Sequence, residues 1–164
     1  MGGKQVQWSS TAKVISNSVE HTERVGEYIG QTVPAGGRIF LYGDLAAGKT
    51  AFVRGFVRHF SPARALDVHS PTYAFMHTYQ TTPPIYHLDL YRVESRDAFF
   101  DLGLDDALDE DRIACIEWPR EWMGPDFGPS LSVYFKSVDG DRRELSFHFN
   151  DLPTLDLKVL EKII

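Results

Sequence analysis

The hydrophobic residues of this chain follow two spacings, that of buried strands and that of amphipathic helices. Residues 38–42 are mostly apolar, with β-branched and aromatic side chains, which predicts a strand buried in a sheet. After residue 50 the apolar positions recur at spacings of one, three and four, which predicts a helix with one apolar stripe. The stripe consists of Phe52, Val53, Phe56, Val57 and Phe60. A strand therefore leads into the segment 43–50, and a helix leads out of it.

The chain before this strand predicts a further strand and a helix. Residues 5–10 are expected to form a short strand. Asn17, with Glu20 three positions on, has the pattern of a helix N-cap, and apolar residues at a spacing of four continue the helix to Val33. Residues 34–37, Pro-Ala-Gly-Gly, are expected to end it.

The middle of the chain predicts two strands and a broken helix. Residues 73–79 and 85–91 alternate around a Thr-Thr-Pro-Pro turn, which predicts an antiparallel pair. Residues 95–111 have a helical pattern that is broken at Gly103, and their acidic residues are typical of a solvated face. A docking surface for a basic partner is the alternative for this acidic stretch. Residues 61–72 carry neither pattern and are expected to be a mobile connection.

The C-terminal part predicts an antiparallel hairpin followed by a helix. Residues 131–135 and 145–149 alternate on either side of Asp139-Gly140, a strong hairpin turn. Residues 155–164 can form a short terminal helix. Because 164 residues are enough for one core and too few for two ordinary domains, residues 1–164 are expected to be a single domain.

Residues 43–50 read Gly-Asp-Leu-Ala-Ala-Gly-Lys-Thr and fit the Gly-x-x-x-x-Gly-Lys-Ser/Thr pattern of a phosphate-binding P-loop. Backbone N–H groups of such a loop converge on a phosphate at a helix N-terminus, and side chains at its two glycines would obstruct the approach. The lysine can reach the β- and γ-phosphates and the threonine hydroxyl can bind Mg²⁺. The predicted nucleotide-binding residues of the loop are Gly43, Ala46, Ala47, Gly48, Lys49 and Thr50. A glycine-containing turn with an incidental lysine is the alternative, which the flanking strand and helix disfavour.

With this loop, the order of elements predicts an α/β fold of the P-loop NTPase type. We expect three layers with a mixed sheet, a central strand that leads into the P-loop, and the C-terminal hairpin added to the sheet.

Two acidic residues at strand ends are candidates for the chemistry. Asp89 lies on the predicted strand 85–91, where a carboxylate can hold Mg²⁺ through water or order the attacking water, and pairing with Arg92 or Arg96 is the alternative. Glu117 ends the apolar run 113–116, as in a Walker-B strand that delivers one carboxylate to Mg²⁺.

Trp118 and Arg120 follow Glu117 directly. They can line the nucleotide pocket, Trp118 by stacking and Arg120 by pairing with a phosphate. The alternative is a tryptophan that caps the core and an arginine on the surface.

Charge and cysteine content narrow the function classes. The net charge of −6 disfavours general nucleic-acid binding, and the cluster of Arg54, Arg58 and Arg64 is of a kind that is usually solvated surface. The single cysteine, Cys115, excludes an internal disulfide and is expected to be a buried thiol. No apolar run has the length of a membrane span and no targeting signal is visible, so a soluble protein of the cytoplasm without membrane partners is expected.

Four motifs occur in register: the P-loop, Ser70-Pro-Thr-Tyr, Tyr86-His-Leu-Asp-Leu-Tyr-Arg and Ile116-Glu-Trp-Pro-Arg. In this order and spacing they closely resemble the TsaE (YjeE) family of bacterial ATPases, from about residue 16 to about residue 150. The resemblance implies a small ATPase of the bacterial system that puts threonylcarbamoyl on adenosine 37 of tRNAs reading ANN codons. It also implies action with TsaB and TsaD, of which TsaD performs the transfer, and only indirect association with tRNA through that complex.

The resemblance also implies ATP and Mg²⁺ as cofactors and assigns roles to single residues. Lys49 is the P-loop lysine, and Thr50 binds Mg²⁺ together with Glu117. Asp89 orders water or belongs to the metal shell, and the two acids can exchange roles. Thr72, in the mobile Ser-Pro-Thr segment, is a candidate γ-phosphate sensor that docking of partners would position. The isolated chain is then expected to hydrolyse ATP slowly.

The sequence departs from the family pattern at Ala46, where the family usually has glycine. If that position needs a positive φ, alanine costs on the order of 1 kcal/mol. Residues 151–164 lie outside the family core. A P-loop small-molecule kinase and a nucleotide-gated binding protein are the alternative functions. GTP is disfavoured because the chain has no Asn-Lys-x-Asp motif.

Overall fold

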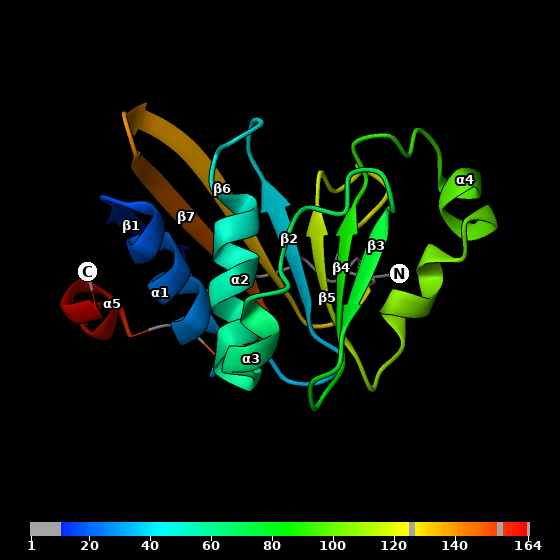
Figure 1. Ribbon diagram of the computed structural model, residues 1–164, viewed down its shortest axis with the longest axis horizontal. Helices are drawn as coiled ribbons and strands as arrows, with labels where there is room; N and C mark the ends of the chain where they lie inside the picture. Colours follow the sequence, from blue (N-terminus) through cyan, green and yellow to red (C-terminus); the bar gives the residue numbers. More distant parts are fainter. Residues whose placement is uncertain (1–10, 125–126, 154–155, 164) are drawn as a thin grey trace, which may run out of the picture.

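The computed structural model describes residues 11–124, 127–153 and 156–163 (Figure 1). The strands are β1 (Thr11–Ser16), β2 (Arg38–Tyr42), β3 (Met76–Tyr79), β4 (Ile85–Asp89), β5 (Ile113–Glu117), β6 (Ser130–Asp139) and β7 (Arg142–Asn150). The helices are α1 (Val19–Gly30), α2 (Lys49–Phe60), α3 (Pro62–Ala65), α4 (Arg96–Asp101), the 3₁₀ helix η1 (Leu104–Leu108) and α5 (Leu157–Ile163).

The strands form one mixed sheet in the order β1-β7-β6-β2-β5-β4-β3. At its centre β2 is parallel to both β5 and β6, and β4 is parallel to β5. The outer pairs β3–β4, β6–β7 and β1–β7 are antiparallel. Because parallel strands end at the same edge, the loops after β2, β4 and β5 meet there. The predicted mixed α/β sheet with a C-terminal hairpin is confirmed.

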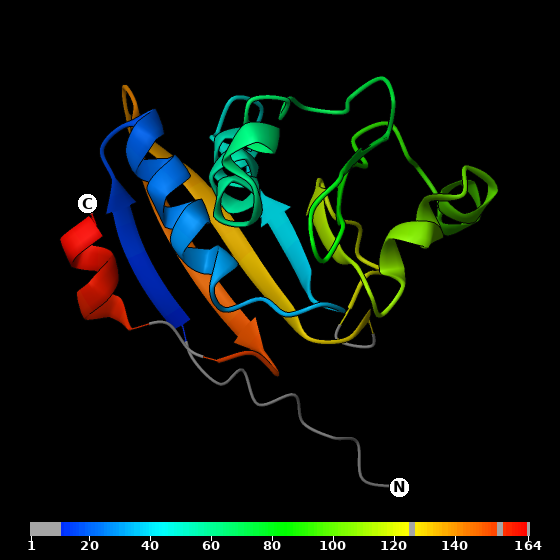
Figure 2. The same ribbon diagram turned by 60° about the horizontal axis from the view of Figure 1, so that its bottom comes forward.

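Each face of the sheet has its own core, as the alternation along β2 shows. Ile39 and Leu41 point to the face covered by α1 and α2, while Phe40 points to the opposite face, where Phe99 of α4 and Leu104 of η1 pack. Figures 1 and 2 show α1 and α2 side by side over one face. The helices and the sheet thus form the three predicted layers.

Glycines allow α1 and α2 to pack unusually closely. A Cβ on Gly26 would lie 2.1 Å from the carbonyl oxygen of Phe52, and a Cβ on Gly55 would lie 1.8 Å from that of Glu23. The Glu23 carboxylate also accepts hydrogen bonds from Arg54, at 3.0 Å, and from Arg58, at 2.7 Å. The expected basic cluster is therefore largely neutralised within the described chain.

Several predicted boundaries at the N-terminal side were wrong. The expected strand over residues 5–10 lies outside the described residues; the described chain begins with β1 over residues 11–16, which was not predicted. The helix is capped by Ser18, whose hydroxyl accepts from the N–H of His21, rather than by Asn17. It ends at Gly30, although Val33 is buried beyond it.

Residues 61–79 also differ from the prediction. The connection 61–72 contains α3, which Ser61 caps by accepting from the N–H of Arg64. The strand begins at Met76 rather than at residue 73 because Phe75, at φ 64°, is in the left-handed region and interrupts the extended backbone. Tyr73 is consequently outside the strand and 87% exposed.

Two further predictions, the break at Gly103 and the buried thiol of Cys115, are confirmed. Gly103, at φ 69°, separates α4 from η1, as the broken helical pattern predicted. Cys115 is fully buried, and burial raises the pKa of its thiol. In the residues that the structure describes, no helix has both the length and the apolarity needed to cross a bilayer.

Candidate nucleotide-binding site

The segment 43–48 leaves β2 and turns directly into α2. Gly48 is the N-cap of α2 at φ 107°, a conformation that favours glycine. Gly43 is needed for a different reason, since a Cβ there would lie 2.9 Å from Cβ of Phe135 and 3.0 Å from its carbonyl oxygen. The second glycine thus shapes the turn, and the first allows β6 to approach it.

Ala46 adopts the left-handed conformation, at φ 59°. The condition under which this alanine costs free energy is therefore met. Arg143 of β7 reaches the same loop, where its Nε donates to the carbonyl oxygen of Ala47 at 3.2 Å. The guanidinium of Arg143 thus binds the P-loop backbone from the hairpin. The two residues are 96 positions apart, and the sequence pattern did not indicate this contact.

Lys49 is bound to the loop itself. Its Nζ donates to the carbonyl oxygens of Gly43, at 2.5 Å, and Asp44, at 2.8 Å, and lies 4.3 Å from the centre of the Trp118 ring. Burial lowers the pKa of Lys49, opposed by the nearby carboxylates, of which Glu117 contributes most. These carbonyl contacts satisfy the ammonium group, and a phosphate would have to replace them.

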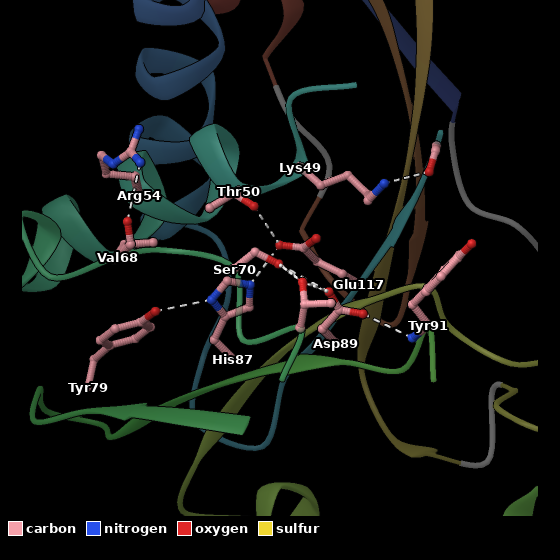
Figure 3. Close-up of polar contacts among 12 residues, drawn as sticks. Lys49, Thr50, Arg54, Val68, Ser70, Tyr79, His87, Asp89, Tyr91 and Glu117 are labelled. Atoms are coloured by element: carbon pink, nitrogen blue, oxygen red, sulfur yellow. Dashed lines mark hydrogen bonds and ion pairs between the residues drawn. The ribbon is translucent and has the colours of Figure 1, made fainter. Parts of the chain in front are cut away.

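Thr50 and Glu117 meet across the start of α2 and the end of β5. The Thr50 hydroxyl donates to Oε1 of Glu117 at 3.0 Å, and Nε2 of His87 lies 2.8 Å from the same oxygen (Figure 3). Burial disfavours the charged form of Glu117, but the hydrogen bonds from His87 and Thr50 and the charge of Lys49 outweigh it and lower the pKa. A buried carboxylate is thus kept ionised beside the P-loop hydroxyl.

Asp89 holds the Ser-Pro-Thr segment. Its Oδ2 accepts from the hydroxyls of Ser70, at 3.0 Å, and Thr72, at 3.1 Å, and its Oδ1 accepts from the N–H of Tyr91 at 2.9 Å. The alternative pairing with Arg92 or Arg96 is wrong, because those guanidinium groups lie over the rings of Phe75 and Phe100. Asp89 thereby fixes Thr72 without a partner protein.

Trp118 lines the cavity, whereas Arg120 does not. Trp118, at φ 55°, lines the cavity beside Lys49. Arg120 is outside the cavity lining, and its Nη2 donates to the carbonyl oxygens of Leu90, at 2.7 Å, and Tyr91, at 3.0 Å. The predicted pairing of Arg120 with a phosphate is therefore not supported, because Arg120 is outside the cavity lining and its Nη2 is bound to the two carbonyls that follow β4.

The candidate residues other than Gly43 and Arg120 line one cavity of about 320 Å³. It is lined by Leu45, Ala46, Ala47, Gly48, Lys49, Thr50, Ala51, Ser70, Thr72, Asp89, Glu117 and Trp118. A larger cavity of about 600 Å³ lies at the opposite end of β2, around Arg38. The guanidinium of Arg38 donates to the carbonyl oxygens of Gly37, Leu108 and Arg112. Its role is therefore to bind these backbone segments together. The smaller cavity is the candidate site.

The donor set of the smaller cavity suits Mg²⁺ bound together with phosphate. Asp89 and Glu117 bring two carboxylates beside the Thr50 hydroxyl. Among the residues described, no group of three or more His, Cys, Asp or Glu side chains can hold a metal ion by itself. A Mg²⁺ site here would therefore rely on oxygens from phosphate and water, as Mg²⁺ sites in phosphate-binding proteins do.

Comparison of this sequence with known protein families shows to which family the chain belongs. Residues 16–145 match the family model described as "Threonylcarbamoyl adenosine biosynthesis protein TsaE". The chain belongs to the TsaE family. Among curated relatives, the tRNA threonylcarbamoyladenosine biosynthesis protein TsaE of Rickettsia felis is 33% identical over 141 residues, 84% of this chain and 80% of that protein. The protein of the same name from Bacillus subtilis is 31% identical over 147 residues, 88% of this chain and 85% of that protein.

A solved relative confirms the fold. The crystal structure of YdiB from Bacillus subtilis superposes with a TM-score of 0.56 at 21% identity, covering 94% of this chain and 91% of that one. The predicted P-loop NTPase-like fold is thereby confirmed. The predicted membership of the TsaE family is confirmed by the family model.

The TsaE site contains residues that the motifs did not single out for a role. Ser70 shares the carboxylate of Asp89 with Thr72, and His87 and Tyr79 form a buried chain behind Glu117. His87 lies two positions before Asp89 on β4, and the alternation along a strand that puts both side chains on one face was the available signal. For Tyr79 and Arg143 the contacts depend on strand pairing and on the hairpin, which spacing does not reveal.

Proposed function

We propose that this TsaE-family chain is a Mg²⁺-dependent ATP hydrolase of tRNA threonylcarbamoyladenosine formation. It acts with TsaB and TsaD on adenosine 37 of tRNAs reading ANN codons, and TsaD performs the transfer. The observation that carries the proposal is the 3.0 Å contact between Thr50 and Glu117, which joins the P-loop helix to the strand that ends in the acid. This is the pairing that a P-loop ATPase requires for its metal ion.

The loop supplies the binding of the triphosphate. Residues at the start of α2 line the cavity, and their backbone N–H groups would bind phosphate together with Lys49, which would exchange its carbonyl partners for phosphate oxygens. Thr50 and Glu117 would hold Mg²⁺, which neutralises charge on the β- and γ-phosphates when bound. Trp118 provides an aromatic wall beside the lysine.

Asp89 supplies the positioning of the attacking water. Its carboxylate is on the cavity wall and is anchored by Ser70, Thr72 and the Tyr91 N–H, so it has a defined orientation. Thr72 would sense the γ-phosphate, since it lines the cavity and its hydroxyl is held beside the carboxylate of Asp89. Partner proteins would act on the segment 61–73, which carries both hydroxyls and the exposed Tyr73.

The test is a reconstitution of tRNA threonylcarbamoylation with TsaB and TsaD, with and without this chain and ATP. We expect modified tRNA only when both are present, and phosphate release without any added small-molecule acceptor. The Lys49→Ala variant is the control for ATP dependence. Phosphate transfer to an added acceptor with no release to water would establish a kinase instead. Nucleotide binding without hydrolysis, even with partners, would establish a gated binding protein.

A further inference from the structure

We propose that His87, oriented by Tyr79, is a positioning residue that holds Glu117 in place for Mg²⁺. The proposal rests on the proposed function, because it assigns a role toward the same metal ion. It adds two residues to the site that neither the P-loop nor the acidic positions include.

Four side chains from four elements form one continuous chain of contacts (Figure 3). The Tyr79 hydroxyl of β3 lies 3.1 Å from Nδ1 of His87 on β4, and Nε2 of His87 lies 2.8 Å from Oε1 of Glu117 on β5. The same Oε1 accepts from the Thr50 hydroxyl of α2 at 3.0 Å. His87 is fully buried, and Tyr79 is 5% exposed.

The chain fixes which ring nitrogen of His87 carries the proton. The Glu117 carboxylate can only accept, so Nε2 of His87 carries a hydrogen and donates to it. Nδ1 of His87 and the Tyr79 hydroxyl form a hydrogen bond on the far side of the ring. Every polar atom in the chain thereby has a partner.

A purely packing role does not account for this arrangement. An apolar side chain at position 87 would fill the space between β3 and β5 without the cost of burying polar groups. Instead, the polar chain ends on the one carboxylate that touches the P-loop threonine. If Thr50 turns its oxygen to a metal ion, His87 remains as the side-chain donor to Glu117 within the described chain. Such outer partners of metal-binding groups set their orientation.

The experiment compares ADP binding by calorimetry with and without Mg²⁺, so that the gain in affinity due to the metal is measured apart from turnover. We expect Tyr79→Phe to reduce this gain several-fold and His87→Leu to reduce it roughly tenfold or more, with metal-free ADP affinity unchanged. His87→Gln, which can place an N–H near the position of Nε2, should recover much of the loss. Tyr86→Phe is the matched control, because Tyr86 packs against the core on the other face of β4.

Thermal unfolding of each variant identifies loss of fold, and Tyr79→Phe keeps the test valid if His87→Leu does not fold. If Mg²⁺ raises the ADP affinity of folded Tyr79→Phe and His87→Leu by as much as it does for the wild type, the positioning role is overturned while the proposed function stays intact. Failure of the wild-type chain to bind ADP or ATP with Mg²⁺ would instead overturn the proposed function.

Discussion

Asp89 and Glu117 lie opposite each other at the ends of the parallel strands β4 and β5. They differ in what they hold: Glu117 accepts from Thr50 of the P-loop helix, and Asp89 accepts from Ser70 and Thr72 of the preceding segment. One pair of neighbouring carboxylates therefore connects the P-loop helix to the segment 70–72. Under the proposed function, Glu117 would have the metal role and Asp89 the water-ordering role.

The two roles predict different responses to Mg²⁺. Loss of a direct ligand should cost at least as much metal affinity as loss of an outer partner, about 10- to 100-fold. Glu117→Ala should therefore raise the Mg²⁺ concentration for half-maximal hydrolysis by that factor, whereas Asp89→Ala should lower the maximal rate with little change in the requirement. Magnesium titrations of phosphate release decide this. If Mg²⁺ rescues Asp89→Ala and not Glu117→Ala, the roles are exchanged.

Replacing Lys49 should weaken ATP binding and abolish hydrolysis. A charge-assisted hydrogen bond contributes about 2 kcal/mol, which corresponds to roughly 30-fold in Kd. Calorimetry on Lys49→Ala should show at least this loss, with the fold retained because the Lys49 partners are carbonyls of its own loop. Lys136→Ala, on an exposed position of β6, is the matched control. Wild-type ATP affinity in folded Lys49→Ala would contradict the P-loop assignment.

Thr72 should matter more for stimulation by TsaB and TsaD than for binding. Its hydroxyl is held by Asp89 in the isolated chain, and removal of one donor aimed at developing charge costs about 100-fold or more in rate. Thr72→Ala should lose stimulated phosphate release by about that factor while keeping ATP affinity. Thr78→Ala, at an exposed position of β3, should respond to partners as the wild type does. Full activity of the wild-type chain alone would rule out completion of the site by partners.

Ala46→Gly should stabilise the protein. At φ 59° an alanine is strained by roughly 1 kcal/mol relative to glycine, although glycine is the more flexible residue in the unfolded chain. We expect a gain of up to about 1 kcal/mol in unfolding free energy, measured by denaturant titration, and tighter binding of Mg²⁺-ATP. Ala47→Gly is the control, since Ala47 is buried without a positive φ and should lose stability instead. Equal effects of the two substitutions would contradict this account.

Gly55→Ala should destabilise the packing of α1 on α2. The added methyl would lie 1.8 Å from the carbonyl oxygen of Glu23, and such overpacking costs about 1–3 kcal/mol, which exceeds the gain in helix propensity of about 1 kcal/mol. The expected loss is seen as a lower urea midpoint. Gly124→Ala should leave the midpoint unchanged, because within the described residues, its chain neighbours aside, no atom lies within 4 Å of the added Cβ. An unchanged midpoint for Gly55→Ala would mean that the helices can separate without cost.

The local pattern of the sequence determined the elements that build the candidate site. Strand, loop and helix around residues 38–60 follow from hydrophobic spacing and from the P-loop residues, because both depend on near neighbours in the chain. Glu117 was found at the end of β5 for the same reason, since a buried apolar strand that ends in an acid is a local signal. Boundaries were less well determined, as Ser18 and Phe75 show, because caps and left-handed residues depend on side-chain and backbone detail.

Only the tertiary structure decided which side chains meet. The pairing of β4 with β5 aligns Asp89 with Glu117 and brings His87 against the same carboxylate. The hairpin carries Arg143 to the P-loop, and the end of β4 takes Arg120 away from the cavity. These contacts join residues far apart in sequence, so strand order and register create them, and no spacing along the chain encodes them.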